Sequence, residues 1–89
     1  MRRDGIDLLV LGERLARVRR SYGAGIDLPN LGRAAFAGLL GVSAAAYGAY
    51  ERGEREPPVE FLVALRNLTR ISLDWLLDMN QPDTPNSVE

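Results

Sequence analysis

Apolar side chains recur at the period of an α-helix along most of the chain. In the first stretch they stand at Leu8, Leu11, Leu15, Val18 and Tyr22. Positions three and four apart share one face of a helix, so this spacing predicts a helix over residues 7–22 with a single buried face. The carboxylate of Asp7 can accept the unpaired N–H groups of the first turn, which makes Asp7 the expected N-cap.

Two short helices joined by a tight turn are expected in the middle of the chain. Phe36, Ala37 and Leu40 form the apolar face of the first helix. Gly41 follows them, at a point where a chain that reverses direction favours a residue able to take positive φ. The hydroxyl of Ser43 can then cap the second helix. The small side chain of Ala37 permits the two backbones to cross closely.

Further helix signals flank this pair. Asn30 is a suitable N-cap for the first helix of the pair, and the second helix carries Tyr47 and Tyr50 on one side. A fourth helix is expected to begin at Pro57–Pro58 and a fifth at Ser72. Their apolar residues are Phe61, Leu62, Leu65 and Leu68 in the fourth, and Trp75, Leu76 and Leu77 in the fifth. The pattern therefore predicts an all-α domain of five helices.

One small domain accounts for the length of 89 residues. Residues 7–79 carry the helical pattern and are expected to fold together. Residues 1–6 and 80–89 hold mainly polar and charged residues, glycine and proline, so flexible ends are expected there. A domain of this size buries only about 60% of the surface of its unfolded chain, so we expect modest stability.

The connection between the first two helices, residues 21–30, combines turn residues with apolar ones. Its turn residues are Gly23, Gly25 and Pro29, and its apolar residues are Ile26 and Leu28. Two interpretations remain open. The apolar pair either packs against the edge of the core or forms a lip that binds a partner.

The middle of the chain resembles a known DNA-binding motif. The residues concerned are Ala37-x-x-x-Gly41-Val42-Ser43, then Tyr47, then Tyr50-Glu51-Arg52-Gly53. This pattern is similar to the helix-turn-helix of the Cro and lambda-repressor (XRE) family, and the likeness extends from about Leu11 to Leu77. The resemblance implies a five-helix lambda-repressor-like DNA-binding domain. The connection at 21–30 is longer than is usual in that family.

The resemblance also implies that the second helix of the motif lies in the major groove, where polar side chains read base edges. Here the outward positions are small: Ala44, Ala45, Ala46, Gly48 and Ala49. An alanine methyl group can contact a thymine methyl group but forms no hydrogen bond, so sequence reading would depend on methyl contacts, one hydroxyl and DNA shape. Arginines would bind the phosphate groups of the DNA backbone. The expected DNA-contacting residues are Arg33, Ser43, Ala44, Ala45, Ala49, Arg52 and Arg55.

Arginines on the predicted first helix have different expected roles. Arg14, Arg17 and Arg20 lie off the apolar stripe and form either a solvated face or further phosphate contacts. For Arg19 the resemblance implies a structural ion pair with Glu51. Such a pair would tie the first helix to the end of the recognition helix.

The last predicted helix carries two candidates for a dimer interface. Trp75 is most simply a core residue. The resemblance, however, implies that this helix helps to form a dimer, so Trp75 or Leu77 is a candidate for packing across a two-fold axis. The expected partners are therefore double-stranded DNA and a second copy of the chain.

The amino-acid composition excludes several kinds of functional site. The chain has no cysteine and no histidine, which removes disulfides, imidazole catalysis and the usual zinc ligands. No apolar run reaches the roughly 20 residues of a membrane span. Asp4, Asp7 and Glu13 interrupt the N-terminal stretch before it could act as a signal peptide. We expect a cytoplasmic protein without metal, cofactor or enzymatic activity.

Two functions remain open from the sequence. The first is a small DNA-binding transcriptional regulator, dimeric and repressor-like. The alternative is a helix-turn-helix protein that acts by binding another protein, as an antiactivator, antitoxin or adaptor. The alternative is favoured by the lack of polar side chains on the reading face and by a net charge of −1. It is also favoured by a run of acidic residues at the end of the motif and after it: Glu51, Glu54, Glu56 and Glu60.

Overall fold

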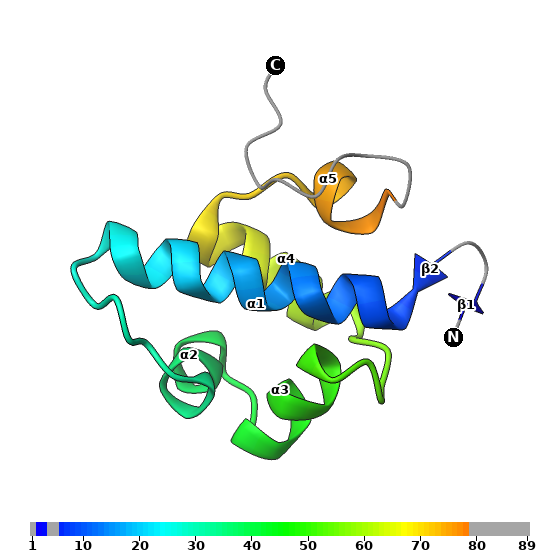
Figure 1. Ribbon diagram of the computed structural model, residues 1–89, viewed down its shortest axis with the longest axis horizontal. Helices are drawn as coiled ribbons and strands as arrows, with labels where there is room; N and C mark the ends of the chain where they lie inside the picture. Colours follow the sequence, from blue (N-terminus) through cyan, green and yellow to red (C-terminus); the bar gives the residue numbers. More distant parts are fainter. Residues whose placement is uncertain (1, 4–5, 79–89) are drawn as a thin grey trace.

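Helix α1 (Leu8–Gly25) is the longest helix in the described part of the chain, and the other helices pack around it (Figure 1). The computed structural model describes residues 2–3 and 6–78. These residues also form α2 (Arg33–Leu40), α3 (Ala44–Glu51), α4 (Val59–Thr69), α5 (Leu73–Leu77), β1 (Arg2–Arg3) and β2 (Ile6–Asp7). The prediction of an all-α fold with five helices is confirmed. In Figure 1, α2 and α3 lie on one side of α1 and α5 lies on the other.

A small hairpin precedes α1 and was not predicted from the sequence. In it, β1 and β2 pair as an antiparallel ladder. Asp7 nevertheless caps α1 as predicted, because its Oδ1 accepts the backbone N–H of Leu9 at 3.0 Å and that of Val10 at 3.3 Å. Residues 1 and 4–5 and the predicted tail at 80–89 lie outside the described residues.

Helix α1 runs further than predicted and takes up part of the long connection. Gly23 is buried near its end, and the N–H of Leu28 donates to the Gly23 carbonyl at 2.7 Å, which closes the helix. Ile26 and Leu28 are 42% and 51% exposed. Leu31, only 8% exposed, fills the edge of the core where these two residues were expected to pack.

The turn between α2 and α3 forms as the sequence predicts. Gly41 has a φ of 76°, and the hydroxyl of Ser43 accepts the N–H of Ala46 at 3.0 Å. The start of α2 differs from the prediction. The helix begins at Arg33 with Gly32 at its N-cap and no capping side chain, so Asn30 does not cap it.

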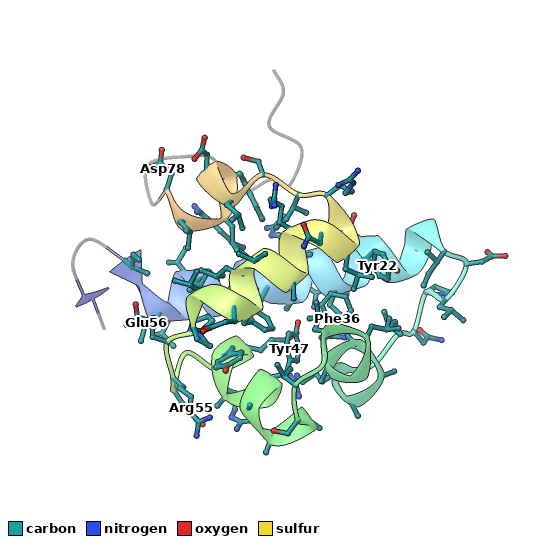
Figure 2. The ribbon with its side chains drawn as sticks, turned by 180° about the vertical axis from the view of Figure 1, so that it is seen from behind. Tyr22, Phe36, Tyr47, Arg55, Glu56 and Asp78 are labelled. Carbon is teal, nitrogen blue, oxygen red and sulfur yellow. The ribbon has the colours of Figure 1, made fainter. Side chains whose placement is uncertain are left out.

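A chain of aromatic rings occupies the centre of the core. Tyr22 and Phe36 lie 5.8 Å apart between ring centroids, and Phe36 meets Tyr47 edge-on at 5.5 Å (Figure 2). Tyr47 in turn lies 6.0 Å from Phe61 of α4. The Tyr47 hydroxyl donates to the carbonyl of Leu15 at 3.4 Å. Tyr47 therefore joins α3 to α1, α2 and α4, and this seats the motif on the rest of the domain.

The C-terminal helices begin close to their predicted starts. Helix α4 follows Pro58 and ends at Thr69, and its C-cap residue Arg70 takes the left-handed conformation with a φ of 64°. The hydroxyl of Ser72 accepts the N–H of Trp75 at 3.2 Å and caps α5. These local features determine where α4 ends and where α5 begins.

Candidate functional site

Helix α3 turns one face to the core and the opposite face to the surface. Tyr47 and Tyr50 point inward and are 0% and 6% exposed. Successive residues turn about 100° around a helix axis, which places Ala45, Gly48 and Arg52 on the side opposite the two tyrosines. Gly48, expected among the outward positions, is nevertheless buried. The outward face therefore has small side chains and one arginine.

The predicted contact residues at the start of α3 lie on the surface, and one further along does not. Ser43, Ala44 and Ala45 are exposed, although the Ser43 hydroxyl is already engaged in capping. Ala49 is only 9% exposed, which corrects its expected place among the open DNA-contacting residues. The chain reverses just after α3, and the N–H of Glu54 donates to the Ala49 carbonyl at 2.9 Å, so the following segment lies beside this residue.

The carboxylate of Glu51, at the end of α3, accepts hydrogen bonds from two arginines. Nε of Arg19 donates to Oε2 of Glu51 at 2.8 Å, and Nε of Arg33 donates to Oε1 at 2.8 Å. Arg19 also donates from Nη1 to the carbonyl of Leu31 at 2.9 Å. The side chains of Glu51, Arg19 and Arg33 are 2%, 13% and 55% exposed. The structure thus brings Arg19 and Glu51 together and links α1, α2 and α3 at one point.

The protonation of this cluster follows from its surroundings. Burial by itself would raise the pKa of Glu51, but hydrogen bonds from the guanidinium groups of Arg19 and Arg33 outweigh it, and the pKa is lowered from its ordinary value. The hydrogen bond to Glu51 raises the pKa of Arg19. Burial and the neighbouring carboxylate raise the pKa of Tyr47 far above its ordinary value, so this hydroxyl stays neutral.

The bond between Arg33 and Glu51 was not predicted. One indication of it was present in the sequence, because an arginine at a helix N-terminus opposes the helix dipole and is stabilised by a nearby negative group. Glu51 supplies that group. Arg33 nevertheless keeps more than half of its side chain open to solvent, beside the start of α2. It can therefore approach a phosphate while it stays bound to Glu51.

Arg14 lies away from this surface, which corrects both of its expected roles. It is 2% exposed, and its Nη1 donates to the carbonyls of Trp75 and Asp78 at 2.8 Å each. Its guanidinium also lies 5.4 Å from the Trp75 ring centroid. A cation suits the carbonyl-rich C-terminal end of a helix, so Arg14 holds α5 against α1. Its place between Leu11 and Leu15 of the apolar stripe was the signal that could have indicated burial.

The two candidate dimer residues differ in their surroundings. Trp75 is 1% exposed and packs within the core, so it cannot form a surface between two copies of this fold. Leu77 is half-buried. Of the predicted pair, only Leu77 stays available for a dimer contact.

The remaining arginines near α3 are exposed. Arg52 is 51% exposed, and its Nε lies 3.1 Å from Oε2 of Glu54. Arg55 projects from the segment after α3, on the side of the molecule where α2 and α3 lie (Figure 2). Arg52 thus lies on the outward face of α3 and Arg33 and Arg55 lie beside that face, whereas the side chain of Glu51 is buried.

Among residues 2–3 and 6–78, no group of three or more aspartate, glutamate, cysteine or histidine side chains is arranged to hold a metal ion. Within the same residues no helix has the length and apolar character needed to cross a membrane.

Comparison with known proteins places this geometry in a family. The model of a family described as "Helix-turn-helix" matches residues 30–76. YonR of Bacillus subtilis, described as an SPbeta prophage-derived uncharacterized HTH-type transcriptional regulator, is 35% identical over 68 residues, which are 76% of this chain and 56% of YonR. YqaE of the same organism, an uncharacterized HTH-type transcriptional regulator, is 47% identical over 38 residues, 43% of this chain and 33% of YqaE. No solved structure gives a significant match.

The match spans α2 to α5 and includes the whole turn between α2 and α3. This chain covers about half of YonR and a third of YqaE, so the likeness concerns the domain rather than the full relatives. The resemblance seen in the sequence is confirmed, and the chain belongs to the helix-turn-helix family of the Cro and lambda-repressor (XRE) type.

Proposed function

We propose that this protein is a DNA-binding transcriptional regulator that places α3 in the major groove of double-stranded DNA. The main support for this proposal is the outward face of α3, which is exposed at Ala44 and Ala45 and has arginines on it and beside it. The major groove is about 12 Å wide and admits one helix, so short side chains let the backbone come close to the base edges. The names of both relatives agree with this role.

Phosphate contacts supply most of the affinity in this proposal. Arg33 and Arg55 flank α3 and are exposed, and phosphate oxygens accept hydrogen bonds from guanidinium groups. Because Glu51 is buried and already bound to two arginines, its charge does not oppose the duplex at this surface. A net charge of −1 for the whole chain is thus compatible with a positive face.

We further propose that the protein binds as a dimer and represses transcription, acting by binding rather than by catalysis. A dimer matches the two-fold symmetry of a palindromic site. Leu77 on α5 is the remaining candidate for the contact between copies. Sedimentation equilibrium of the wild type and of Leu77→Asp tests this arrangement, because a dimer through α5 predicts a monomeric variant.

A salt-dependent mobility-shift assay with the DNA upstream of the protein's own gene tests the proposed function. Specific binding whose affinity falls steeply with salt is expected, since each phosphate contact contributes a slope of about −0.9 in a plot of log K against log salt. Arg33→Ala should flatten that slope by about one unit. Arg66→Ala removes an exposed arginine from α4 and should leave the slope unchanged. Absence of any shift at low salt contradicts the proposal.

Binding to another protein is the second candidate, and the connection after α1 favours it. Leu28 is 51% exposed at the edge of a hollow of about 420 Å³ that is lined by residues 28–32 and Ala35. A single exposed leucine is ordinary on a protein surface, so this candidate depends on the hollow beside Leu28, into which a side chain of a partner could fit. Co-purification of one defined protein, lost in Leu28→Asp, together with no shift on DNA would support this function over the first.

A further inference from the structure

The side chain of Arg52 runs back along α3 instead of away from it. Arg52 forms the C-cap of the helix, and side chains on a helix lean toward its N-terminus. Its guanidinium therefore lies over Gly48, one turn earlier. A Cβ atom on Gly48 would stand 2.9 Å from Nη1 and 3.7 Å from Cζ of Arg52. The arginine head thus occupies the space that a side chain at residue 48 would fill.

This arrangement gives a reason for a glycine in the middle of α3. Glycine is less favourable than alanine inside a helix, so its presence needs a cause. Gly41 and Gly53 have positive φ, whereas Gly48 does not, so the backbone does not require glycine at this position. The three atoms nearest to a Cβ on Gly48 all belong to the Arg52 guanidinium. Space for that guanidinium is the cause that the structure offers.

The guanidinium is also placed at the centre of the outward face. Gly48 and Arg52 lie opposite the buried Tyr47 and Tyr50, and the exposed methyl group of Ala45 lies beside them. Nε of Arg52 is held by Glu54 at 3.1 Å. Its two terminal nitrogens, Nη1 and Nη2, have no hydrogen-bond partner among the described residues and form a planar fork.

We propose that Arg52 reads a guanine in the major groove rather than gripping a phosphate, with Gly48 making room for it and Glu54 orienting it. A guanine presents O6 and N7 side by side, and a forked guanidinium donates to both. Arg52 was expected from the sequence to bind phosphate, so this assigns it a different partner. The proposal rests on the proposed DNA-binding function. It makes Arg52 the specificity-determining residue of a face otherwise built from methyl groups.

Selection of binding sites from a library of randomised duplexes tests this assignment. We expect the wild type to select a G·C pair at one position in each half-site. Replacing that guanine by another base should weaken wild-type binding about 5- to 150-fold. Arg52→Ala should lose the preference at that position and keep it elsewhere. Duplexes with 7-deazaguanine, which lacks N7, should weaken binding by the wild type but not by Arg52→Ala.

Gly48→Ala provides a variant that keeps the fold. The atoms nearest to the added methyl group belong to the end of a flexible side chain, so we expect thermal stability at or above that of the wild type. The displaced guanidinium should nevertheless lose most of its guanine preference. Gly38→Ala on α2 is the matched control, because its methyl group meets nothing within 4 Å. It should leave the selected sequence unchanged.

The outcomes separate this inference from the proposed function. If the wild type selects no sequence and shows no shift on any duplex, the proposed function fails and the inference fails with it. If the wild type selects a sequence and Arg52→Ala selects the same one with uniformly weaker affinity and a flatter salt slope, Arg52 binds phosphate and the inference alone is overturned. Unchanged guanine preference in Gly48→Ala also overturns it.

Discussion

Removing Arg19 tests the structural part of this account, the cluster around Glu51. The side chain of Glu51 is 2% exposed. In Arg19→Ala its carboxylate loses the two hydrogen bonds that Nε and Nη2 of Arg19 donate. Breaking a buried ion pair by removing one partner destabilises a protein by about 3–5 kcal/mol. Arg33 still binds Glu51, so we expect the lower end of that range.

Two control variants allow the loss of stability in Arg19→Ala to be compared with that at more exposed arginines. Arg33→Ala removes a partner that is 55% exposed, and such surface pairs contribute about 0–1 kcal/mol. Arg20→Ala changes an exposed residue of the same helix as Arg19 and should stay within about 0.5 kcal/mol of the wild type. The destabilisation should therefore be large for Arg19→Ala, small for Arg33→Ala and near zero for Arg20→Ala.

Thermal unfolding followed by circular dichroism measures these differences. For a domain of this size, 1 kcal/mol corresponds to about 4–8 °C, so a loss of about 3 kcal/mol lowers the Tm by about 12–24 °C. Urea unfolding with an unchanged m-value would show that the variants differ in stability alone. Equal Tm values for Arg19→Ala and Arg20→Ala would refute the reasoning, because Arg19 would then act as an ordinary surface charge.

The remaining predictions concern acid and close packing. The native pKa of Glu51 lies below its ordinary value of 4.5, so its carboxylate stabilises the fold above that pH, and this contribution is lost as the pH falls through the native pKa. Urea titrations at a series of pH values should show a smaller acid loss in Glu51→Gln than in the wild type, and equal losses would contradict the role of Glu51. A methyl group on Gly12 would collide with the backbone carbonyl of Glu51, whereas one on Gly38 meets nothing. Gly12→Ala should thus lower the Tm while Gly38→Ala does not, and similar Tm values would contradict the close approach of α1 to α3.

Local signals account for the parts of the fold that the sequence predicts well. Asp7, Gly41, Ser43 and Ser72 act within a few residues of themselves, by accepting nearby N–H groups or by taking positive φ. Their roles can be recognised without knowing what the rest of the chain does. The apolar stripes likewise depend only on helical spacing. These features suffice to predict five helices and the turn between α2 and α3.

The differences arise where distant segments meet. From the sequence Arg14 was expected to be an exposed cation. In the structure three carbonyl groups at the end of α5 accept hydrogen bonds from its Nη1. Ala49 was expected to face outward. In the structure the chain reverses after α3, and the following segment lies beside Ala49. Arg33 and Arg19 share one carboxylate because α1, α2 and α3 converge at Glu51. None of these contacts is set by local spacing. The resemblance already implied the pair between Arg19 and Glu51, whereas the surroundings of Arg14 and Ala49 and the bond from Arg33 were found only in the tertiary packing.

The most direct test of the central proposal places a negative charge on the outward face of α3. Ala45 is exposed, so Ala45→Glu should fold normally, and Asn67→Glu on α4 adds the same charge at another exposed position. The measurement is the Kd of each variant and of the wild type for the duplex upstream of the protein's own gene. We predict that Ala45→Glu abolishes specific binding while Asn67→Glu binds like the wild type. Wild-type affinity in Ala45→Glu would contradict the claim that α3 enters the major groove.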